Sequence, residues 1–283
     1  MAQIQWFPGH MAKAKREIAE KIKLIDIVVE LVDARAPYSS KNPLFNGIVN
    51  NKPRLIVMTK EDLANPEITK KWIQYYKDHG YYAMSVNLKQ FNEYKKIIQV
   101  CKEILKDKME REAKKGLKPR AMRAMVLGIP NVGKSTFINR LAKRKATVTG
   151  NKPGVTKAQQ IIKVDKDFEL FDTPGVLWPK FEDEKVGVLL AVSGAIRDEI
   201  LPLEEVAAWA MRFLMQHKPE LLEKRYAIEL DEDPYSNFTK IAEKRGFLKN
   251  GKEIDFKRTI ETFLREIRDD RLGSITWENA DEV

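Results

Sequence analysis

The stretch GIPNVGKS, at residues 128–135, has the residue types and the spacing of a phosphate-binding loop. It matches G-x-x-x-x-G-K-[ST] in full, and it lies between an apolar stretch and a helical pattern. Its glycines let backbone N–H groups turn toward phosphate oxygens, and the start of the following helix adds favourable dipole charge. Here Lys134 would contact the β- and γ-phosphates of a nucleotide, and Ser135 would bind Mg²⁺. The loop residues that we expect at the nucleotide are Asn131, Val132, Gly133, Lys134, Ser135 and Thr136.

A second motif, DTPG at residues 172–175, follows another apolar stretch. Because Asp172 ends this stretch, we predict that its carboxylate reaches Mg²⁺ through a water molecule, while the N–H of Gly175 meets the γ-phosphate. The polar loop GNKPGVTK at 150–157 lies between the two motifs. It is a candidate switch, in which one hydroxyl binds Mg²⁺ and releases it after hydrolysis. Thr156 is the predicted hydroxyl. The alternatives are Thr147, Thr149 and a purely structural threonine.

A candidate base-reading motif, MTKED at residues 58–62, precedes the phosphate loop. The usual form is N-K-x-D, and Thr59 replaces the asparagine here. Lys60 can lay its aliphatic stem along a purine face. Asp62 can accept hydrogen bonds from the ring N–H and the exocyclic amine of guanine, a donor pair that adenine lacks. Ser85, after a further apolar stretch, can offer its backbone N–H to guanine O6. Because base readers usually follow the phosphate loop, MTKED is either a chance match or a sign that the parts of the site have been reordered.

Alternating strand and helix patterns around these motifs predict an α/β fold. Short apolar stretches predict strands at 25–33, 54–59, 81–86, 123–128, 160–165 and 168–172. The last two are expected to pair as a hairpin, and the helical patterns between the others favour a mostly parallel sheet with helices on both faces. From about residue 180 the patterns are helical. We therefore predict a domain at 1–179 that contains all three motifs, followed by a small all-α domain at 180–283.

Charge and cysteine content narrow the class of protein. The chain of 283 residues has a formal net charge of +10, which favours a polyanionic partner, nucleic acid before membrane, although a merely soluble basic protein is the alternative. Cys101 is the single cysteine, so no disulfide can form within the chain. Because no apolar run has the length of a signal peptide or a membrane span, we expect a cytoplasmic protein. The spacing of His and Cys predicts no metal site, and we see neither a hydrolase triad nor an RNP motif or zinc knuckle.

At this point the sequence resembles the circularly permuted GTPases related to ribosome biogenesis GTPase A (YlqF). The motifs that carry the resemblance are WFPGHMAKA, DIVVELVDARAP, SSKNP, TKED, GIPNVGKSTFINRL, PGVTK and DTPGVLWPK. They occur in a distinctive order and, with the helical tail, cover nearly the whole chain. The resemblance implies a permuted P-loop GTPase domain followed by an RNA- or ribosome-binding helical domain. It also implies a cytoplasmic enzyme that uses GTP and Mg²⁺ and helps to mature the large (50S) ribosomal subunit. Thr59 departs from the asparagine that is usual at its position.

Three residues bear on hydrolysis. Many GTPases have a water-positioning glutamine after the DxxG glycine, and Val176 stands there instead, which predicts slow hydrolysis unless a partner completes the site. His10, in the family hallmark PGHM, is a candidate for orienting the water once the partner binds; packing or contact with RNA is the alternative. Asn131 resembles the asparagine that helps related GTPases to hold a monovalent cation, which predicts dependence on K⁺. The predicted catalytic set is His10, Lys134, Thr156 and Gly175.

The sequence leaves more than one functional interpretation open. We expect an assembly GTPase for the large ribosomal subunit, with slow intrinsic hydrolysis that the ribosomal particle stimulates, and with rRNA rather than DNA or membrane as its polyanionic partner. The reordering lets the segment after DTPG run into the helical tail, so contacts of Gly175 with the γ-phosphate could bias the orientation of the tail. The alternative is a nucleotide-gated rRNA-binding module in which hydrolysis is incidental. A signalling GTPase that acts on a protein is a third reading, which the charge disfavours.

Overall fold

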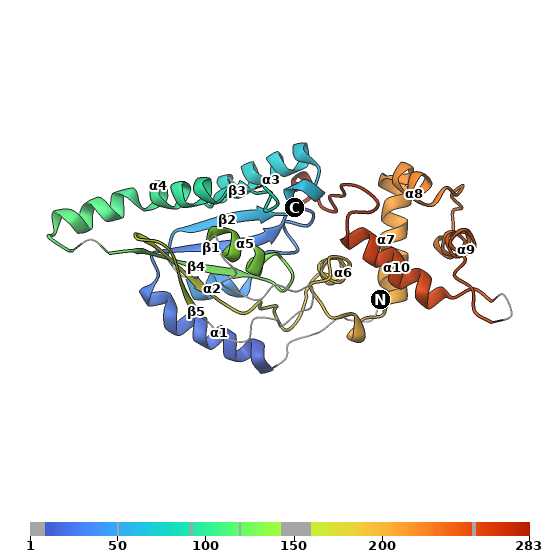
Figure 1. Cartoon of the computed structure of the whole chain (residues 1–283), viewed down its shortest axis with the longest axis horizontal. Coiled ribbons are helices and arrows are strands. Elements are labelled where there is room, and N and C mark those ends of the chain that lie inside the picture. Colours follow the sequence, from blue (N-terminus) through green and yellow to red (C-terminus); the bar gives the residue numbers. More distant parts are fainter. Residues whose placement is uncertain (1–8, 50, 91–92, 119, 143–159, 251–252) are drawn as a thin grey trace. The chain divides into compact units, whose positions relative to one another are not determined.

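The computed structural model describes residues 9–49, 51–90, 93–118, 120–142, 160–250 and 253–283. By its internal contacts the chain forms two compact units (Figure 1). The sheet unit contains the described residues up to Lys180 together with Ile275–Val283, and the helical unit is Phe181–Ser274. Residues 275–283 therefore lie with the sheet, whereas the sequence pattern grouped them with the helical tail. The division of the chain into domains at 179/180 stays a proposal.

A single six-stranded sheet organises the first unit. Its strands are β1 (Ile27–Asp33), β2 (Arg54–Thr59), β3 (Tyr82–Ser85), β4 (Met122–Gly128), β5 (Gln160–Asp165) and β6 (Phe168–Asp172). They lie in the order β3-β2-β1-β4-β6-β5, and all neighbours are parallel except β5 and β6, which form the expected hairpin. The predicted α/β fold is confirmed. Because the carboxyl ends of parallel strands meet at one edge, the segments that follow β1, β2, β3, β4 and β6 converge there.

Helices of the sheet unit lie on both faces of the sheet. They are α1 (Gly9–Lys21), α2 (Leu44–Val49), α3 (Pro66–Asp78), α4 (Glu93–Lys114) and α5 (Lys134–Leu141). In Figure 1, α4 runs along one side of the sheet and α1 along the other. The start of α3 is specified locally: Asn65 accepts hydrogen bonds from two backbone N–H groups of the first turn, and Pro66 occupies the first helical position.

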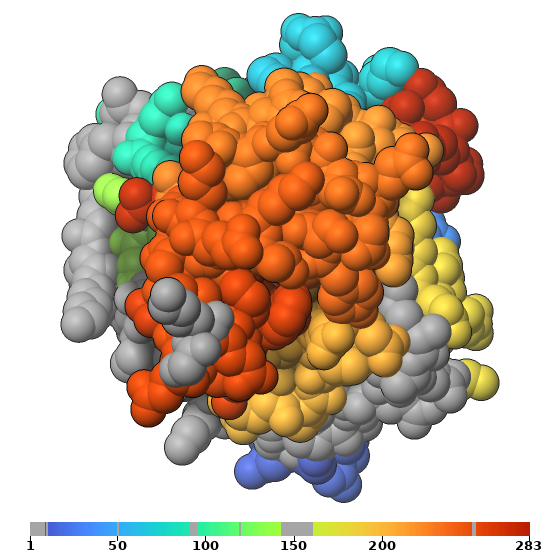
Figure 2. All heavy atoms as spheres, turned by 90° about the vertical axis from the view of Figure 1, so that its right-hand side faces the viewer, coloured from blue at the N-terminus to red at the C-terminus, as the bar shows by residue number. Residues whose placement is uncertain are grey.

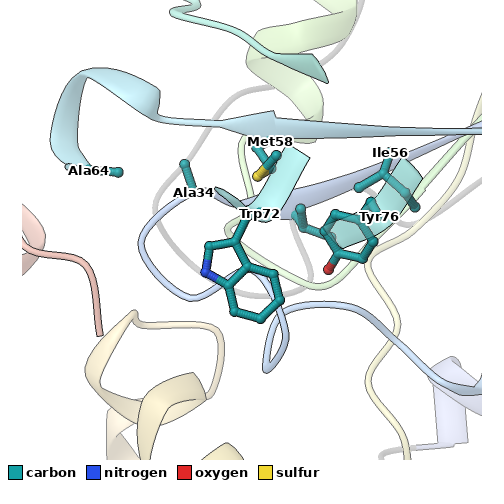
Figure 3. Close-up of a cluster of buried hydrophobic side chains, with 7 residues drawn as sticks. Ala34, Ile56, Met58, Ala64, Trp72 and Tyr76 are labelled. Atoms are coloured by element: carbon teal, nitrogen blue, oxygen red, sulfur yellow. The ribbon is translucent and has the colours of Figure 1, made fainter. Parts of the chain in front are cut away.

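The apolar face of α3 packs on β1 and β2 next to the base-reading motif (Figure 3). Trp72 and Tyr76 are fully or almost fully buried against Ile56 and Met58 of β2 and Ala34 after β1. The Tyr76 hydroxyl donates a hydrogen bond of 2.9 Å to the carbonyl of Pro37. This cluster fixes the segments that follow β1 and β2 at the edge of the sheet.

The second unit is helical, as predicted for the segment after residue 180. Its helices are α6 (Glu184–Val192), α7 (Leu203–His217), α8 (Pro219–Tyr226), α9 (Pro234–Arg245) and α10 (Phe256–Arg268). In Figure 2 the orange to orange-red residues of this unit form one packed body. Phe238 of α9 meets Phe263 of α10 edge to face at 5.3 Å between ring centres. Among the described residues, no helix is both long enough and apolar enough to cross a membrane.

Candidate nucleotide site

The phosphate loop lies where the sequence predicted it, between β4 and α5. Asn131 and Gly133 adopt positive φ angles of 58° and 97°, and α5 begins at Lys134. Ser135 and Thr136 therefore belong to the first turn of α5, and the N-terminal end of a helix favours an anion. Lys134 is only 7% exposed and donates a long hydrogen bond of 3.4 Å to the Gly128 carbonyl.

The ammonium of Lys134 is buried, and the opposing charge of Asp172 does not fully offset the cost of this burial. Removal of its ammonium from water lowers the pKa of Lys134 to about 8, although the Asp172 carboxylate opposes the shift. Asp172 ends β6 and is itself buried, at 1% exposure. A polyphosphate bound at this loop would supply the negative charge that keeps Lys134 protonated.

The DTPG segment lies directly against the phosphate loop. A Cβ atom on Gly175 would be 2.9 Å from the Cα and N atoms of Pro130, which are backbone atoms and cannot turn aside. The next residue, Val176, is hydrogen-bonded through both its backbone N–H and its carbonyl. Val176 N–H donates to the Gly128 carbonyl (3.2 Å), and the Val176 carbonyl accepts from Asn42 Nδ2 (2.7 Å). Val176 is buried at 1% exposure, so the chain does not leave the sheet immediately after Gly175.

Thr59 joins the base-reading motif to the phosphate loop. It ends β2, is fully buried and lies opposite Asp33 in the β1–β2 register. Its hydroxyl oxygen is 2.6 Å from the Val132 carbonyl and 3.1 Å from the Val32 carbonyl, so the proton is best donated to Val132. The threonine that departs from the usual asparagine thus ties together two segments that lie far apart in the sequence.

Lys60 is held by a buried charge cluster that the sequence reasoning missed. It adopts a left-handed conformation (φ 59°), and its Nζ lies 2.8 Å from Asp33 Oδ2. The same carboxylate accepts from the backbone N–H of Arg35 (3.0 Å) and from two nitrogens of the Arg35 guanidinium, Nε (3.0 Å) and NH2 (2.8 Å). Burial alone would raise the pKa of Asp33, but Arg35 and Lys60 outweigh it and hold this pKa far below its usual range. The sequence signal for this cluster was DAR at residues 33–35, which begins with the last residue of β1.

Asp62 and Ser85 complete the base end of the site. Asp62 lies in a short 3₁₀ turn (Glu61–Leu63), and its carboxylate is 2.6 Å from the ammonium of Lys89. Ser85 ends β3 and lies opposite Met58, and the following Val86 N–H donates to the Met58 carbonyl at 2.9 Å. The structure therefore brings the predicted base readers to the same sheet edge as the phosphate loop.

Two predicted residues cannot be placed. Thr156 lies outside the described residues, as do Thr147 and Thr149. His10 is at the start of α1, but its side chain is outside what the structure describes.

Comparison with known proteins decides the family. Residues 123–225 match the family described as 50S ribosome-binding GTPase. The chain is 52% identical over 280 residues to Ribosome biogenesis GTPase A of Bacillus cereus, covering 99% of this chain and 95% of that protein. It is 53% identical over 282 residues to Ribosome biogenesis GTPase A of Priestia megaterium, covering 99% and 98%. The chain belongs to the ribosome biogenesis GTPase A family.

A solved structure gives the same answer for the fold. The crystal structure of GNP-bound YlqF from T. maritima matches with a TM-score of 0.67 and 25% identity, covering 96% of this chain and all of that one. The chain is thus a GTPase with a circularly permuted domain, in which the MTKED segment precedes the phosphate loop. The match to the 50S ribosome-binding GTPase family begins at residue 123, within β4, and leaves the base-reading strands outside it.

The donor chemistry of this GTPase suits Mg²⁺. Within the described residues, no group of three or more His, Cys, Asp or Glu side chains is arranged to hold a metal ion. Mg²⁺ at nucleotide sites requires less than that, because it keeps waters and shares the phosphate oxygens. The hydroxyl of Ser135 lies just after the phosphate loop, and the buried Asp172 carboxylate is an oxygen donor of the kind that Mg²⁺ prefers.

Proposed function

We propose that this GTPase is an assembly factor for the large (50S) ribosomal subunit, and that the ribosomal particle stimulates its slow intrinsic hydrolysis. The observation that carries the nucleotide site is the hydrogen bond of 2.6 Å from Thr59 to Val132, which holds the base-reading and phosphate-binding segments at one edge. The ribosomal role is supported by the family and by the net charge of +10. We propose rRNA, rather than DNA or a membrane, as the polyanionic partner, and the cytoplasm as the location.

The roles that we propose at the phosphates follow the positions of the residues. Lys134 binds the β- and γ-phosphates, Ser135 and Asp172 hold Mg²⁺, the latter through water, and the N–H of Gly175 meets the γ-phosphate. Thr156 is proposed as the switch hydroxyl on Mg²⁺. We propose that Asn131, whose positive φ turns the loop, helps to hold K⁺. Val132, Gly133 and Thr136 complete the phosphate contacts.

At the base, we propose that Lys60 lies along the purine and that Asp62 accepts from the guanine N–H donors. The Ser85 N–H reaches O6, and Thr59 acts by holding the two ends together. For guanine to reach Asp62, the ammonium of Lys89 must move aside.

Slow intrinsic hydrolysis is proposed from Val176. Its side chain is apolar and buried, and its backbone N–H and carbonyl are both engaged, so it offers nothing to an attacking water. A group from elsewhere has to position the water. We propose that His10 does so once the particle binds, and that the orientation of the helical unit follows the state of Gly175.

The test is GTP hydrolysis by the purified protein in potassium buffer, with and without large ribosomal subunits. Strong stimulation by the subunits, absent when ATP replaces GTP, is expected. His10→Ala should abolish the stimulation and leave GTP binding intact. Fast hydrolysis by the isolated protein would contradict the proposal.

A nucleotide-gated rRNA-binding module is the second candidate, and the buried Val176 is the observation that favours it. In that case the protein would bind the subunits tightly and in a nucleotide-dependent way, without stimulated hydrolysis. A steep loss of binding with added salt is expected for either candidate, because Lys and Arg contacts to phosphates release counterions.

A further inference from the structure

Residues 275–283, which we call the return segment, run back from the helical unit along two loops of the nucleotide site. Ile275 N–H donates to the Leu63 carbonyl (3.0 Å), and Asn65 N–H donates to the Thr276 hydroxyl (2.8 Å). Trp277 N–H then donates to the Arg35 carbonyl (2.8 Å). The return segment therefore bonds on one side to the loop that follows Asp62 and on the other to the loop that follows β1.

Glu278 anchors the return segment most firmly. Its side chain is buried, at 7% residue exposure, and accepts from the backbone N–H groups of Tyr38 (2.8 Å) and Ser39 (3.0 Å) as well as from the Ser39 hydroxyl. Its carbonyl accepts a hydrogen bond of 3.1 Å from Trp72 Nε1 of α3. Backbone donors that converge on one carboxylate fix the conformation of the 38–39 loop.

The bonds continue from this loop to Lys60. Ser40, next to the residues that Glu278 holds, accepts a hydrogen bond of 2.8 Å from the backbone N–H of Asp33 and donates to the Ala36 carbonyl (2.6 Å). Asp33 in turn holds the ammonium of Lys60. Glu278 is thus connected to Lys60 through the loop after β1, and Thr276 is connected to the Asp62 turn through the loop after β2.

We propose that Thr276 and Glu278 are positioning residues of the guanine site: they hold the two loops that set where Lys60 and Asp62 meet the base. This inference rests on the proposed assignment of Lys60 and Asp62 as base readers. The phosphate loop is placed by β4, by α5, by the contact with DTPG and by Thr59, and Thr59 is itself held by the pairing of β2 with β1 rather than by the return segment. Loss of the return segment's bonds should therefore weaken guanine recognition and spare phosphate binding.

Glu278→Ala and Glu278→Gln test the proposal, with the affinities for GDP and for inorganic tripolyphosphate measured by calorimetry in the full chain. Because displacement of binding groups by about 1 Å can cost roughly 100-fold, we expect Glu278→Ala to weaken GDP binding about 10- to 100-fold. Tripolyphosphate binding should change by less than about twofold. Glu278→Gln keeps one acceptor oxygen and should give an intermediate loss. If the alanine variant fails to fold, the same ratio in the glutamine variant decides the matter.

Asp281→Asn is the matched control within the return segment. Asp281 pairs with Lys71 on the exposed face of α3 and bonds to neither loop, so its replacement should leave both affinities unchanged. Equal losses of GDP and tripolyphosphate binding in the Glu278 variants would overturn the proposal, as would no loss in either.

Asp62→Asn separates failure of this proposal from failure of the base assignment. An amide at residue 62 offers a donor where guanine needs an acceptor, so the variant should lose GDP and gain affinity for xanthosine diphosphate. If it binds both as the unaltered protein does, Asp62 is not the base reader, and the inference falls with that assignment. If it behaves as expected while the Glu278 variants bind GDP normally, only the inference falls.

Discussion

At the phosphate end of the site, Lys134 is buried beside one opposing carboxylate and its pKa is lowered to about 8, whereas at the base end Lys60 lies 2.8 Å from a carboxylate that Arg35 also holds. At the phosphate end, the backbone of the loop is already formed, and a bound phosphate would supply the negative charge that Lys134 lacks. The base end is held by the protein's own ion pairs and by the return segment. Binding of a nucleotide should therefore be driven by charge at the first end and limited by geometry at the second.

Lys134→Met should have the largest effect, because it removes the cation that the phosphates need. Since hydrogen bonds to charged groups contribute about 1.5–3 kcal/mol each, GDP affinity should fall by roughly 100-fold. Methionine keeps most of the volume and removes a buried charge, so the free energy of unfolding without nucleotide should stay the same or rise. Calorimetry measures the loss of GDP affinity, and thermal unfolding measures the stability of the free protein. A large loss of stability would contradict the view that the charge of Lys134 serves the ligand rather than the fold.

Gly175→Ala should lower GTP hydrolysis by roughly 5- to 150-fold, because overpacking against backbone costs about 1–3 kcal/mol. The new methyl group would lie 2.9 Å from Pro130 and push the DTPG segment off the phosphate loop. Gly47→Ala is the control: it lies within α2 with nothing within 4 Å of an added Cβ, and it should be neutral or stabilising. Similar single-turnover rates in the two variants would show that the contact with Pro130 does not matter.

The pH dependence of GDP affinity follows from Lys134. Phosphates favour the protonated lysine, so the pKa of Lys134 rises on binding, and affinity should fall as pH increases above about 8, by up to about tenfold per unit. The stability of the free protein should change in the opposite direction. The folded pKa is depressed below 10.5, so stability rises as pH increases from about 8 toward 10.5. Lys134→Arg stays charged throughout and should lose both dependences between pH 7 and 9.

Thr59→Val tests the bond that joins the two ends. The variant keeps the shape but leaves the Val132 carbonyl without the hydroxyl donor. A bond of this kind contributes about 0.5–1.5 kcal/mol, which predicts a loss of GDP affinity of roughly 2- to 10-fold. Thr59→Ser keeps the hydroxyl and should bind GDP nearly as the unaltered protein does. If serine and valine give the same loss, packing rather than the hydrogen bond is responsible.

Lys89→Ala should change GDP affinity least, and the direction of the change is what tests the comparison. Lys89 is 73% exposed and pairs with the carboxylate that we assign to guanine, so it competes with the base. Exposed pairs are worth about 0.2–1 kcal/mol, and the variant should bind GDP about 1.4- to 5-fold more tightly. The gain should shrink at high salt, where the ion pair is already screened. Weaker binding would mean that Lys89 contacts the nucleotide instead.

The sequence predicted the parts of the site whose signal is local. The apolar stretches gave the strands, and the full G-x-x-x-x-G-K-[ST] match located Lys134 and Ser135 at the start of α5. The sequence did not predict contacts between segments that lie far apart in the chain. The bond of Thr59 to Val132 depends on strand pairing, and the bond of Glu278 to Ser39 joins residues 239 positions apart without any periodic pattern. The closeness of Gly175 to Pro130 likewise follows from the packing of two loops, which a motif does not specify.

The return segment also has a consequence for biosynthesis. The sheet unit is discontinuous in the sequence, because residues 181–274 are translated between its two parts. Since chains fold from the N-terminus as they are made, the phosphate loop and its strands can assemble on the ribosome well before residue 275 exists. The loops that follow Asp33 and Asp62 gain their bonds to Trp277 and Thr276 afterwards. We therefore expect a nascent chain that has not yet reached residue 275 to bind phosphate without discriminating among bases.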